Sequence, residues 1–342
     1  MKTKIIHIDE KNTDAPGELE KLREAAKVIK KGGLVVFPTE TVYGLGANAL
    51  DGSAVRKIYE AKGRPSDNPL IAHVAKPSDI GEYAQITEAA GRIIEEFLPG
   101  PLTLVLKKKG PELDACCRLD TIAVRSPKNN AARKLIELAG APVAAPSANL
   151  SGRPSHTRPE YIIKDMDGRA DMIICGENCE IGLESTVISF NLDDSVNILR
   201  SGYITREMLS GYKIRDEAQI SGAPRSPGVK YAHYSPRAPL YILSSGSDAK
   251  IIEFVDRETR NKKAGFLCFD ELLGCFKENK NIVPIGARDD LAAQAKNLFG
   301  ALNRLDTLGL EVIYSIEPAR TGLGEAIYNR LIKAAGGKVI EV

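Results

Sequence analysis

"ELEKLREAAKVIKKGGLVVFP", residues 18–38, is the stretch that decides the fold of the first part of this chain. Its apolar residues recur at helical spacing, and a pair of glycines at 32 and 33 ends that pattern. The next five residues, LVVFP, predict a short buried strand. A helix followed directly by a buried strand is typical of layered α/β domains.

The same alternation continues to about residue 205. Further helices are expected at 53–63, 89–100 and 131–140, and further strands at 69–75, 102–109, 121–127, 143–149, 172–175, 185–190 and 196–200. We therefore expect a mixed α/β sheet covered by helices.

Residues 211–239 break this alternation, because they hold four prolines and three glycines with little apolar periodicity. A second alternation follows, with strands near 240, 264, 282, 311 and 338 and helices such as 289–309 and 324–337. The sequence thus predicts a domain at 1–210, a linker at 211–239 and a smaller α/β domain with a parallel sheet at 240–342.

Charge and composition limit the classes of function. The 342 residues carry 47 Lys and Arg against 45 Asp and Glu, a formal net charge of +2, so any anion site must be local. We expect no membrane span and no signal peptide, and hence a cytosolic protein. The six cysteines contain no C-x-x-C pair, which favours reduced thiols over a zinc site.

The loop "FPTETVYGLGANA" (37–49) formally fits the dinucleotide pattern G-x-G-x-x-A from Gly44 to Ala49. Five residues separate the expected strand from Gly44, however, which disfavours a nucleotide fingerprint. The hydroxyls of Thr39 and Thr41 could bind a small polar ligand or form local turn bonds.

The next loop, "AKGRPSDNPL" (61–70), carries Lys62 and Arg64 after the end of a helix. Such cations can complement the helix dipole, but a lysine and an arginine together also suit phosphate or carboxylate. His73, in the strand that follows, could be a buried structural histidine or a ligand contact.

Arg125 ends the apolar strand 121–125, where its charge requires a carboxylate, either from the protein or from a ligand. The turn "VAAPSANLSGRPS" (143–155) offers Ser147, Asn149, Ser151 and Ser155, which allow an anion to approach backbone N–H groups. No P-loop, no G-x-S-x-G motif, no catalytic Cys-His signature and no carboxylate cluster for a metal is present in the sequence. The residues alone indicate an anion-binding α/β enzyme that works by positioning and charge stabilisation.

Taken together, the motifs resemble the L-threonylcarbamoyladenylate synthase family, whose catalytic part is the YrdC-type domain. The resemblance rests on "FPTETVYGLGANA", "AKGRPSDNPLIAHV", "PGPLTLVL", "TIAVRSP", "APSANLSGRPS" and "GLESTVI", in this order between about residues 15 and 205. The linker "SPGVKYAHYSP" (226–236) and "GLGEAIYNRLIKAA" (322–335) resemble the two-domain members. This implies a YrdC-like twisted mixed sheet with helices, followed by a smaller Rossmann-like α/β domain.

The resemblance further implies that L-threonine, bicarbonate and ATP give threonylcarbamoyl-AMP and pyrophosphate, for threonylcarbamoyladenosine formation next to the anticodon of tRNA. Lys62 and Arg64 would be catalytic, with Mg²⁺ held mainly by the ATP phosphates. The implied ATP contacts are Lys62, Arg64, Asn68, Thr121, Ser147, Ser155, Arg200 and Tyr234, and the implied threonine contacts are Thr41, His73, Arg125, Ala145 and Ser185. The partners would be tRNA and the machinery that transfers the threonylcarbamoyl group.

Three further readings stay open at this point. The first domain could be a double-stranded RNA-binding module without catalysis, although the near-neutral charge argues against it. The C-terminal domain could bind a nucleotide at "TGLGEAIYNR" (321–330), where glycines precede a helix. The linker is long enough to lie over the first domain as a lid that brings Tyr234 to ATP.

Overall fold

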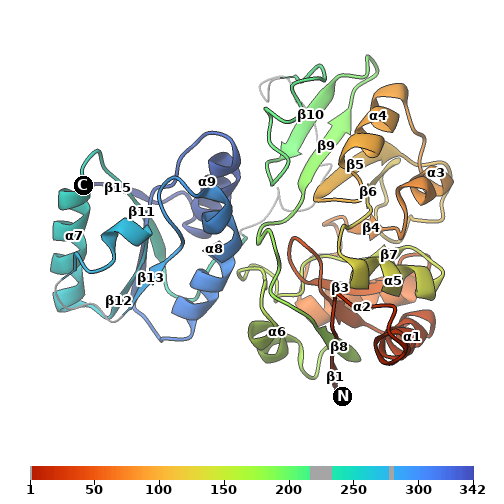
Figure 1. Ribbon diagram of the computed structural model, residues 1–342, viewed down its shortest axis with the longest axis horizontal. Helices are drawn as coiled ribbons and strands as arrows, with labels where there is room; N and C mark the ends of the chain where they lie inside the picture. The colour runs from red at the N-terminus through yellow and green to blue at the C-terminus, as the bar shows by residue number, and fades with distance from the viewer. Residues whose placement is uncertain (1, 216–232, 277–280) are drawn as a thin grey trace. The chain divides into compact units, whose positions relative to one another are not determined.

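The computed structural model describes residues 2–215, 233–276 and 281–342, which form two compact units (Figure 1). Of these residues, the first unit holds 2–151, 156–180 and 184–215, and the second holds 152–155, 181–183 and 233–342. The second unit is therefore discontinuous along the chain. The centre of the expected linker, residues 216–232, lies outside the described residues.

The first unit is built on a ten-stranded sheet with helices packed on it. Its strands are β1 (Lys4–His7), β2 (Val35–Phe37), β3 (Gly44–Asn48), β4 (Ile71–His73), β5 (Leu102–Lys107), β6 (Thr121–Arg125), β7 (Val143–Ala144), β8 (Met172–Cys175), β9 (Thr186–Phe190) and β10 (Val196–Arg200). Its helices are α1 (Pro16–Lys30), α2 (Gly52–Lys62), η1 (Pro77–Asp79), α3 (Ile80–Tyr83), α4 (Glu88–Phe97), α5 (Asn130–Ala139) and α6 (Pro159–Met166).

The strand order is β1-β8-β2-β3-β7-β4-β6-β5-β9-β10. Parallel pairs, such as β4 with β6 and β5 with β9, alternate with antiparallel pairs, such as β2 with β3 and β5 with β6. The mixed sheet expected from the sequence is confirmed.

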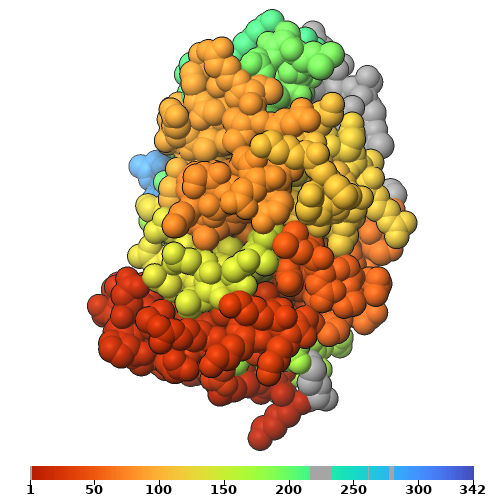
Figure 2. Space-filling view, turned by 90° about the vertical axis from the view of Figure 1, so that its right-hand side faces the viewer, coloured from red at the N-terminus to blue at the C-terminus, as the bar shows by residue number. Residues whose placement is uncertain are grey.

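Alternating residues of β2 face two different helical layers. Val35 and Phe37 pack in one cluster with residues of α1 and α5. Val36 packs in the other cluster, with residues of α2, α4 and α6. Figure 1 shows α1 and α5 side by side, and they also adjoin on the surface in Figure 2, where α1 is red and α5 yellow. The continuous apolar run at 34–37 exists because both faces of β2 are buried.

A third, small cluster lies farther along the same sheet. It consists of Ile71, Val105, Ala123 and Val187, with Leu199 packed against it, and every member belongs to a strand. Residues two positions along a strand share a face. Residues 73 and 125 therefore lie on the same face as this cluster, and this is the part of the sheet that carries the candidate site.

Gly44 and Gly46 allow neighbouring side chains to pack against the backbone of this stretch. The stretch expected as a loop contains the strand β3, which pairs antiparallel with β2. A Cβ at Gly46 would lie 2.7 Å from the ring of Phe37 and 2.8 Å from Val143. Glycine is therefore required here because the Phe37 ring lies against the backbone of β3, and the apparent dinucleotide fingerprint has a structural explanation.

The second unit is an α/β domain with a five-stranded parallel sheet in the order β13-β12-β14-β11-β15. This confirms the parallel sheet expected from the sequence. Its elements are β11 (Leu240–Ser244), α7 (Asp248–Asn261), β12 (Ala264–Cys268), η3 (Asp270–Leu272), β13 (Ile282–Pro284), α8 (Leu291–Asp306), β14 (Val312–Ile316), α9 (Leu323–Ala334) and β15 (Val339–Glu341). Among the residues that the structure describes, no helix has the length and apolar character needed to cross a membrane.

Candidate functional site

Arg125 lies at the end of β6 with only 4% of its surface exposed. Its Nη2 donates to Glu40 Oε1 at 2.5 Å, its Nη1 to Thr41 Oγ1 at 2.9 Å, and its Nε to the carbonyl of Gly100 at 3.1 Å. A guanidinium has five N–H groups, so two of them have no hydrogen-bond partner among the described residues. The carboxylate that the sequence required for Arg125 is thus Glu40 of the protein itself. The two remaining N–H groups leave room for a carboxylate of a ligand.

Glu40 is the residue that the sequence analysis missed. It is buried to the same extent as Arg125, and its second oxygen accepts from the backbone N–H of Asn129 at 3.3 Å. Burial alone would raise the pKa of Glu40, but the charge of Arg125 and backbone hydrogen bonds hold that pKa below its usual value. The only signal in the sequence was an acidic residue inside an otherwise apolar and hydroxyl-bearing stretch.

The two threonines beside Glu40 make the local bonds that the sequence allowed. Thr39 Oγ1 donates to the carbonyl of Val42 at 2.6 Å and lies 2.9 Å from Thr41 Oγ1. Thr41 in turn accepts from Arg125. The turn bonds therefore fix the hydroxyl of Thr41 against the guanidinium of Arg125. A role of these hydroxyls in local turn bonds is thus compatible with a role in binding a ligand.

His73 is the register partner of Arg125 in the β4–β6 pair. Burial, and then the charge of Arg125, lowers the pKa of His73 to about 3, so the ring is neutral at physiological pH. Its Nδ1 has no hydrogen-bond partner among the described residues, and Phe37 meets the ring edge-on. A neutral imidazole with an unused nitrogen can donate to or accept from a ligand hydroxyl.

Lys62 closes α2 and is 3% exposed. Its Nζ donates to the carbonyl of Ser147 at 2.5 Å and to the carbonyl of Asn149. The Ser147 hydroxyl donates to Asn149 Oδ1 at 2.6 Å, so the lysine and the S-x-N turn form one unit. Burial, and then the neighbouring charge of Arg64, lowers the pKa of Lys62 well below its usual value.

The turn after α2 holds two further predicted residues. Gly63 adopts the left-handed conformation that ends the helix, and Arg64 Nη2 then donates to the carbonyl of Pro69 at 3.2 Å. Asn68 is buried, and its carbonyl accepts from the hydroxyl of Tyr59. Lys62, the last residue of α2, and Arg64, just past its end, are therefore both held where the helix ends. Thr121 begins β6, the strand that ends in the arginine of the first cluster.

Arg200 and Ser185 form a third group. The guanidinium of Arg200 donates to the carbonyl of Ser185 at 2.9 and 3.1 Å and reaches its hydroxyl at 3.2 Å. The same hydroxyl lies 2.7 Å from Thr103 Oγ1. Ala145 follows β7, and its N–H donates to the carbonyl of Ile71 on the neighbouring strand.

Ser155 and Tyr234, the remaining two predicted residues, belong to the second unit. The carbonyl of Ser155 accepts from Asn303 Nδ2 at 3.0 Å. Tyr234 is 4% exposed, adopts a φ of 67°, and packs its ring 5.3 Å from that of Phe299, with the Arg330 guanidinium 5.8 Å from its centre. The structure gives both residues defined partners within that unit.

No group of three or more His, Cys, Asp or Glu side chains among the described residues could hold a metal ion. All six cysteines are free thiols. The three groups in the first unit instead bring together two kinds of feature, namely cationic side chains and hydroxyls held by hydrogen bonds. Such an arrangement is suited to anions and small polar ligands.

Two family models match most of this chain. A family model described as "Telomere recombination", for Sua5, YciO and YrdC proteins, matches residues 27–202, and a model described as "Threonylcarbamoyl-AMP synthase, C-terminal domain" matches residues 204–336. The threonylcarbamoyl-AMP synthase of Bacillus subtilis is 41% identical, covering 99% of this chain and 100% of the relative. That of Pyrococcus abyssi is also 41% identical, covering 94% and 96%.

A solved structure of P. abyssi Sua5 complexed with L-threonine is 38% identical, covers 99% of this chain and 100% of its own, and superposes with a TM-score of 0.86. The match extends over both units. This chain therefore belongs to the threonylcarbamoyl-AMP synthase family, in its two-domain form.

Proposed function

We propose that this protein joins L-threonine, bicarbonate and ATP into threonylcarbamoyl-AMP with release of pyrophosphate. The observation that carries the proposal is the full-length similarity to threonylcarbamoyl-AMP synthases, one of them solved with L-threonine, together with a buried arginine that has two N–H groups to spare. The protein is then an enzyme of the nucleotidyltransferase type.

Arg125 takes the threonine carboxylate through its two remaining N–H groups in a bidentate pair. Glu40 and Thr41 hold the guanidinium on its other side, so little side-chain entropy is lost when the substrate binds. The neutral ring of His73 and the hydroxyl of Ser185 contribute polar contacts, and Ala145 supplies a small wall. A neutral histidine is important here because a second cation would repel the substrate amine.

ATP binds to the cations of the turn after α2. Lys62 and Arg64 neutralise the phosphates and the charge that builds up as pyrophosphate leaves. The other ATP contacts are assigned to Asn68, Thr121, Ser147, Ser155, Arg200 and Tyr234. Among the described residues, the hydrogen bonds of Lys62 go to the carbonyls of Ser147 and Asn149, so the ATP phosphates would bring an anionic partner to it.

The chemistry needs no protein nucleophile. The threonine amine attacks bicarbonate to give a carbamate and water, and a carbamate oxygen then attacks the α-phosphorus of ATP, so that the bond to pyrophosphate breaks. Arg125 orients the threonine, while Lys62 and Arg64 stabilise the phosphates. For these two steps to follow each other, bicarbonate must lie within reach of the threonine amine, and the carbamate must lie within reach of the α-phosphorus of ATP.

Mg²⁺ belongs to the proposal as part of the bound ATP complex. The described residues offer no carboxylate cage, so the ion would be held by phosphate oxygens and water. Its contribution is to neutralise phosphate charge.

Three finer points complete the proposal. The product is passed to a transferase that modifies tRNA next to the anticodon. The location is cytoplasmic, which six free thiols support, because reduced cysteines are typical of that compartment. The lid expected from the sequence falls on residues 216–232, which lie outside those described.

The test is pyrophosphate release by the purified full-length protein, with threonine, bicarbonate and ATP each omitted in turn. We expect release only when all three are present, and an adenylated threonine carbamate by mass spectrometry. Release that continues without threonine or bicarbonate would contradict the proposal. Binding of double-stranded RNA without any turnover would favour the alternative of a non-catalytic RNA-binding module.

A further inference from the structure

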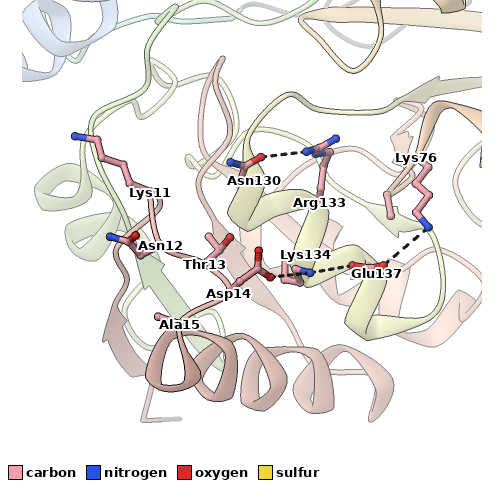
Figure 3. Close-up of a pocket in the computed structure, with 11 residues that line it drawn as sticks. Lys11, Asn12, Thr13, Asp14, Ala15, Lys76, Asn130, Arg133, Lys134 and Glu137 are labelled. Atoms are coloured by element: carbon pink, nitrogen blue, oxygen red, sulfur yellow. Dashed lines mark hydrogen bonds and ion pairs between the residues drawn. The ribbon is translucent and has the colours of Figure 1, made fainter.

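A cavity of about 610 Å³ lies between the loop that precedes α1 and the first turns of α5 (Figure 3). Its volume is in the range of small-molecule sites. None of the residues assigned to threonine or ATP lines it; the lining residues are 11–15, 75–76, Asn130, Arg133, Lys134 and Glu137. The cavity is therefore a feature of the first unit that the proposed reaction does not use.

The wall of this cavity is positively charged. It carries the cations Lys11, Lys76, Arg133 and Lys134 against two carboxylates, Asp14 and Glu137, which leaves a surplus of two positive charges. A concave wall with a surplus of one sign of charge concentrates ions of the opposite sign.

Three of these cations are already paired. Lys134 lies 3.0 Å from Asp14 and 3.4 Å from Glu137, and those hydrogen bonds raise its pKa. Lys76 lies 4.0 Å from Glu137, and Lys11 lies 3.2 Å from Glu177, which is outside the lining. Their stems are flexible and exposed, apart from that of Lys134, so Lys11 and Lys76 can turn toward a bound anion at little cost.

Arg133 differs from the other three. No carboxylate among the described residues is within ion-pair distance of it, and its one side-chain hydrogen bond there is from Nη2 to Asn130 Oδ1 at 3.1 Å. Its Nε atom is buried without a hydrogen-bond partner. A buried N–H of a cation that lacks an acceptor is costly, and a bound anion would satisfy it.

Thr13 supplies a second unused donor. Its side chain is only 6% exposed, lines the cavity, and makes no hydrogen bond with any described residue. Figure 3 shows it on the loop before α1, on the side that faces α5. The hydroxyl oxygen itself is accessible rather than buried, so it is a donor that a ligand in the cavity could use.

Two helices begin at this cavity. Ala15, at the N-cap of α1, provides no side-chain cap, and the first helical bond comes from the N–H of Leu19. The Ala15 N–H donates to the carbonyl of Asn12 at 2.9 Å and Pro16 has no N–H, so only the N–H groups of Gly17 and Glu18 are left at this end of the helix. Asn130, the first residue of α5, lines the opposite side. Helix N-termini carry partial positive charge and favour anions.

We propose that this cavity binds a small, multiply charged phosphate compound. Arg133 is its main binding side chain, with the Thr13 hydroxyl and the start of α1 as further donors. The lining contains no aromatic side chain and only two alanines as apolar residues, so it offers no surface on which a base would stack. The rest of the ligand is accordingly polar, as in a sugar phosphate. This inference is independent of the proposed reaction.

The experiment uses the protein carrying Lys62→Met, Arg64→Gln and Arg200→Gln, which removes the three cations proposed for ATP. Calorimetric titration with inorganic pyrophosphate and with ribose 5-phosphate should show one binding event, weakened by added NaCl. Adding Arg133→Gln should weaken it about tenfold or more. The matched control is Arg92→Gln, which removes an exposed arginine of α4 and should leave the affinity unchanged.

A second variant protects the test against misfolding. Thr13→Val should also weaken binding, whereas Thr13→Ser keeps the hydroxyl and should bind as the parent does. In crystals soaked with tungstate, a phosphate-like anion visible by anomalous scattering, the peak should lie within hydrogen-bond distance of Arg133. The proposal is overturned if neither phosphate compound binds, if Arg133→Gln behaves as Arg92→Gln does, or if a single-stranded RNA binds through Arg133 while the small compounds do not.

Discussion

Glu40 and Arg125 form a buried ion pair, with 2.5 Å between Oε1 and Nη2. The pair lies between two parts of the chain that are 85 residues apart. It fixes the guanidinium that we assign to the threonine carboxylate, so structural and functional effects of substituting either residue must be separated.

Arg125→Met should lower the free energy of unfolding by about 3–5 kcal/mol, because it leaves the Glu40 carboxylate buried without a cation. Adding Glu40→Gln, which removes that charge, should recover at least half of the loss. Both proteins should lack threonine-dependent pyrophosphate release. Urea unfolding checks the first part, and a double variant no more stable than the single one would show that the ion pair is not the cause.

The pKa of His73 predicts a pH dependence of stability. Below about pH 6.5 the unfolded chain binds a proton on this ring, whereas the folded protein, with a pKa of about 3, does not. The free energy of unfolding should therefore fall by about 1.4 kcal/mol per pH unit below pH 6.5. His73→Asn should flatten the slope between pH 6.5 and 5. Glu40 does not interfere, because its lowered pKa places its titration below this window. Equal slopes in the two proteins would contradict the assignment.

Lys62 predicts proton uptake when ATP binds. Its pKa is well below the usual value in the ligand-free protein, and the ATP phosphates would raise it. At pH 8, calorimetry in two buffers of different ionisation enthalpy should reveal protons taken up by the wild type. Lys62→Arg, whose guanidinium is always protonated, should take up fewer. No difference between the two proteins would mean that Lys62 is already charged before ATP arrives.

Gly46→Ala tests whether the glycines of β3 serve packing. The added Cβ would lie 2.7 Å from the Phe37 ring, so we expect a loss of about 1–3 kcal/mol in stability. The matched control is Gly17→Ala in the first turn of α1, where a Cβ meets nothing within 4 Å and should cost nothing. Thermal unfolding of the two variants decides the point.

Tyr234 can be tested without disturbing its packing. Tyr234→Phe keeps the ring against Phe299 and removes only the hydroxyl, so it should weaken ATP affinity and cost less stability than Tyr234→Ala. Tyr234→Ala should weaken ATP affinity and also lower the free energy of unfolding, because removing a buried aromatic ring costs about 3–5 kcal/mol. If both variants kept the ATP affinity of the wild type, the assignment of Tyr234 to ATP would fall.

Most of the fold was predictable, because the spacing of apolar residues and the length of each apolar run distinguish helices from strands. The helix before β2, the buried run of β2 and the strands ending in Arg125 and Arg200 follow from apolar spacing alone. The strand β3 was not predicted, because glycines usually indicate turns. The packing of its glycines against Phe37 depends on the neighbouring strand β2, which their local sequence does not show.

The site was predictable only in part. Lys62 and Ser147 were both expected to contact ATP, and the structure joins them, together with Asn149, by hydrogen bonds. Glu40 was missed because its partner lies far along the chain, and only the folded sheet brings the two together. The unpaired hydroxyl of Thr13 could not be seen either, because a sequence does not show which polar groups are left without a partner.

The discontinuity of the second unit bears on any attempt to divide this protein. Ser155 lies among residues of the first unit in the sequence, yet Asn303 holds its carbonyl. A chain cut after residue 215 would retain Ser155 and lose that partner. Loss of ATP turnover in such a fragment would consequently not locate catalysis in the second unit, and the informative comparison is the full-length protein with Asn303→Leu.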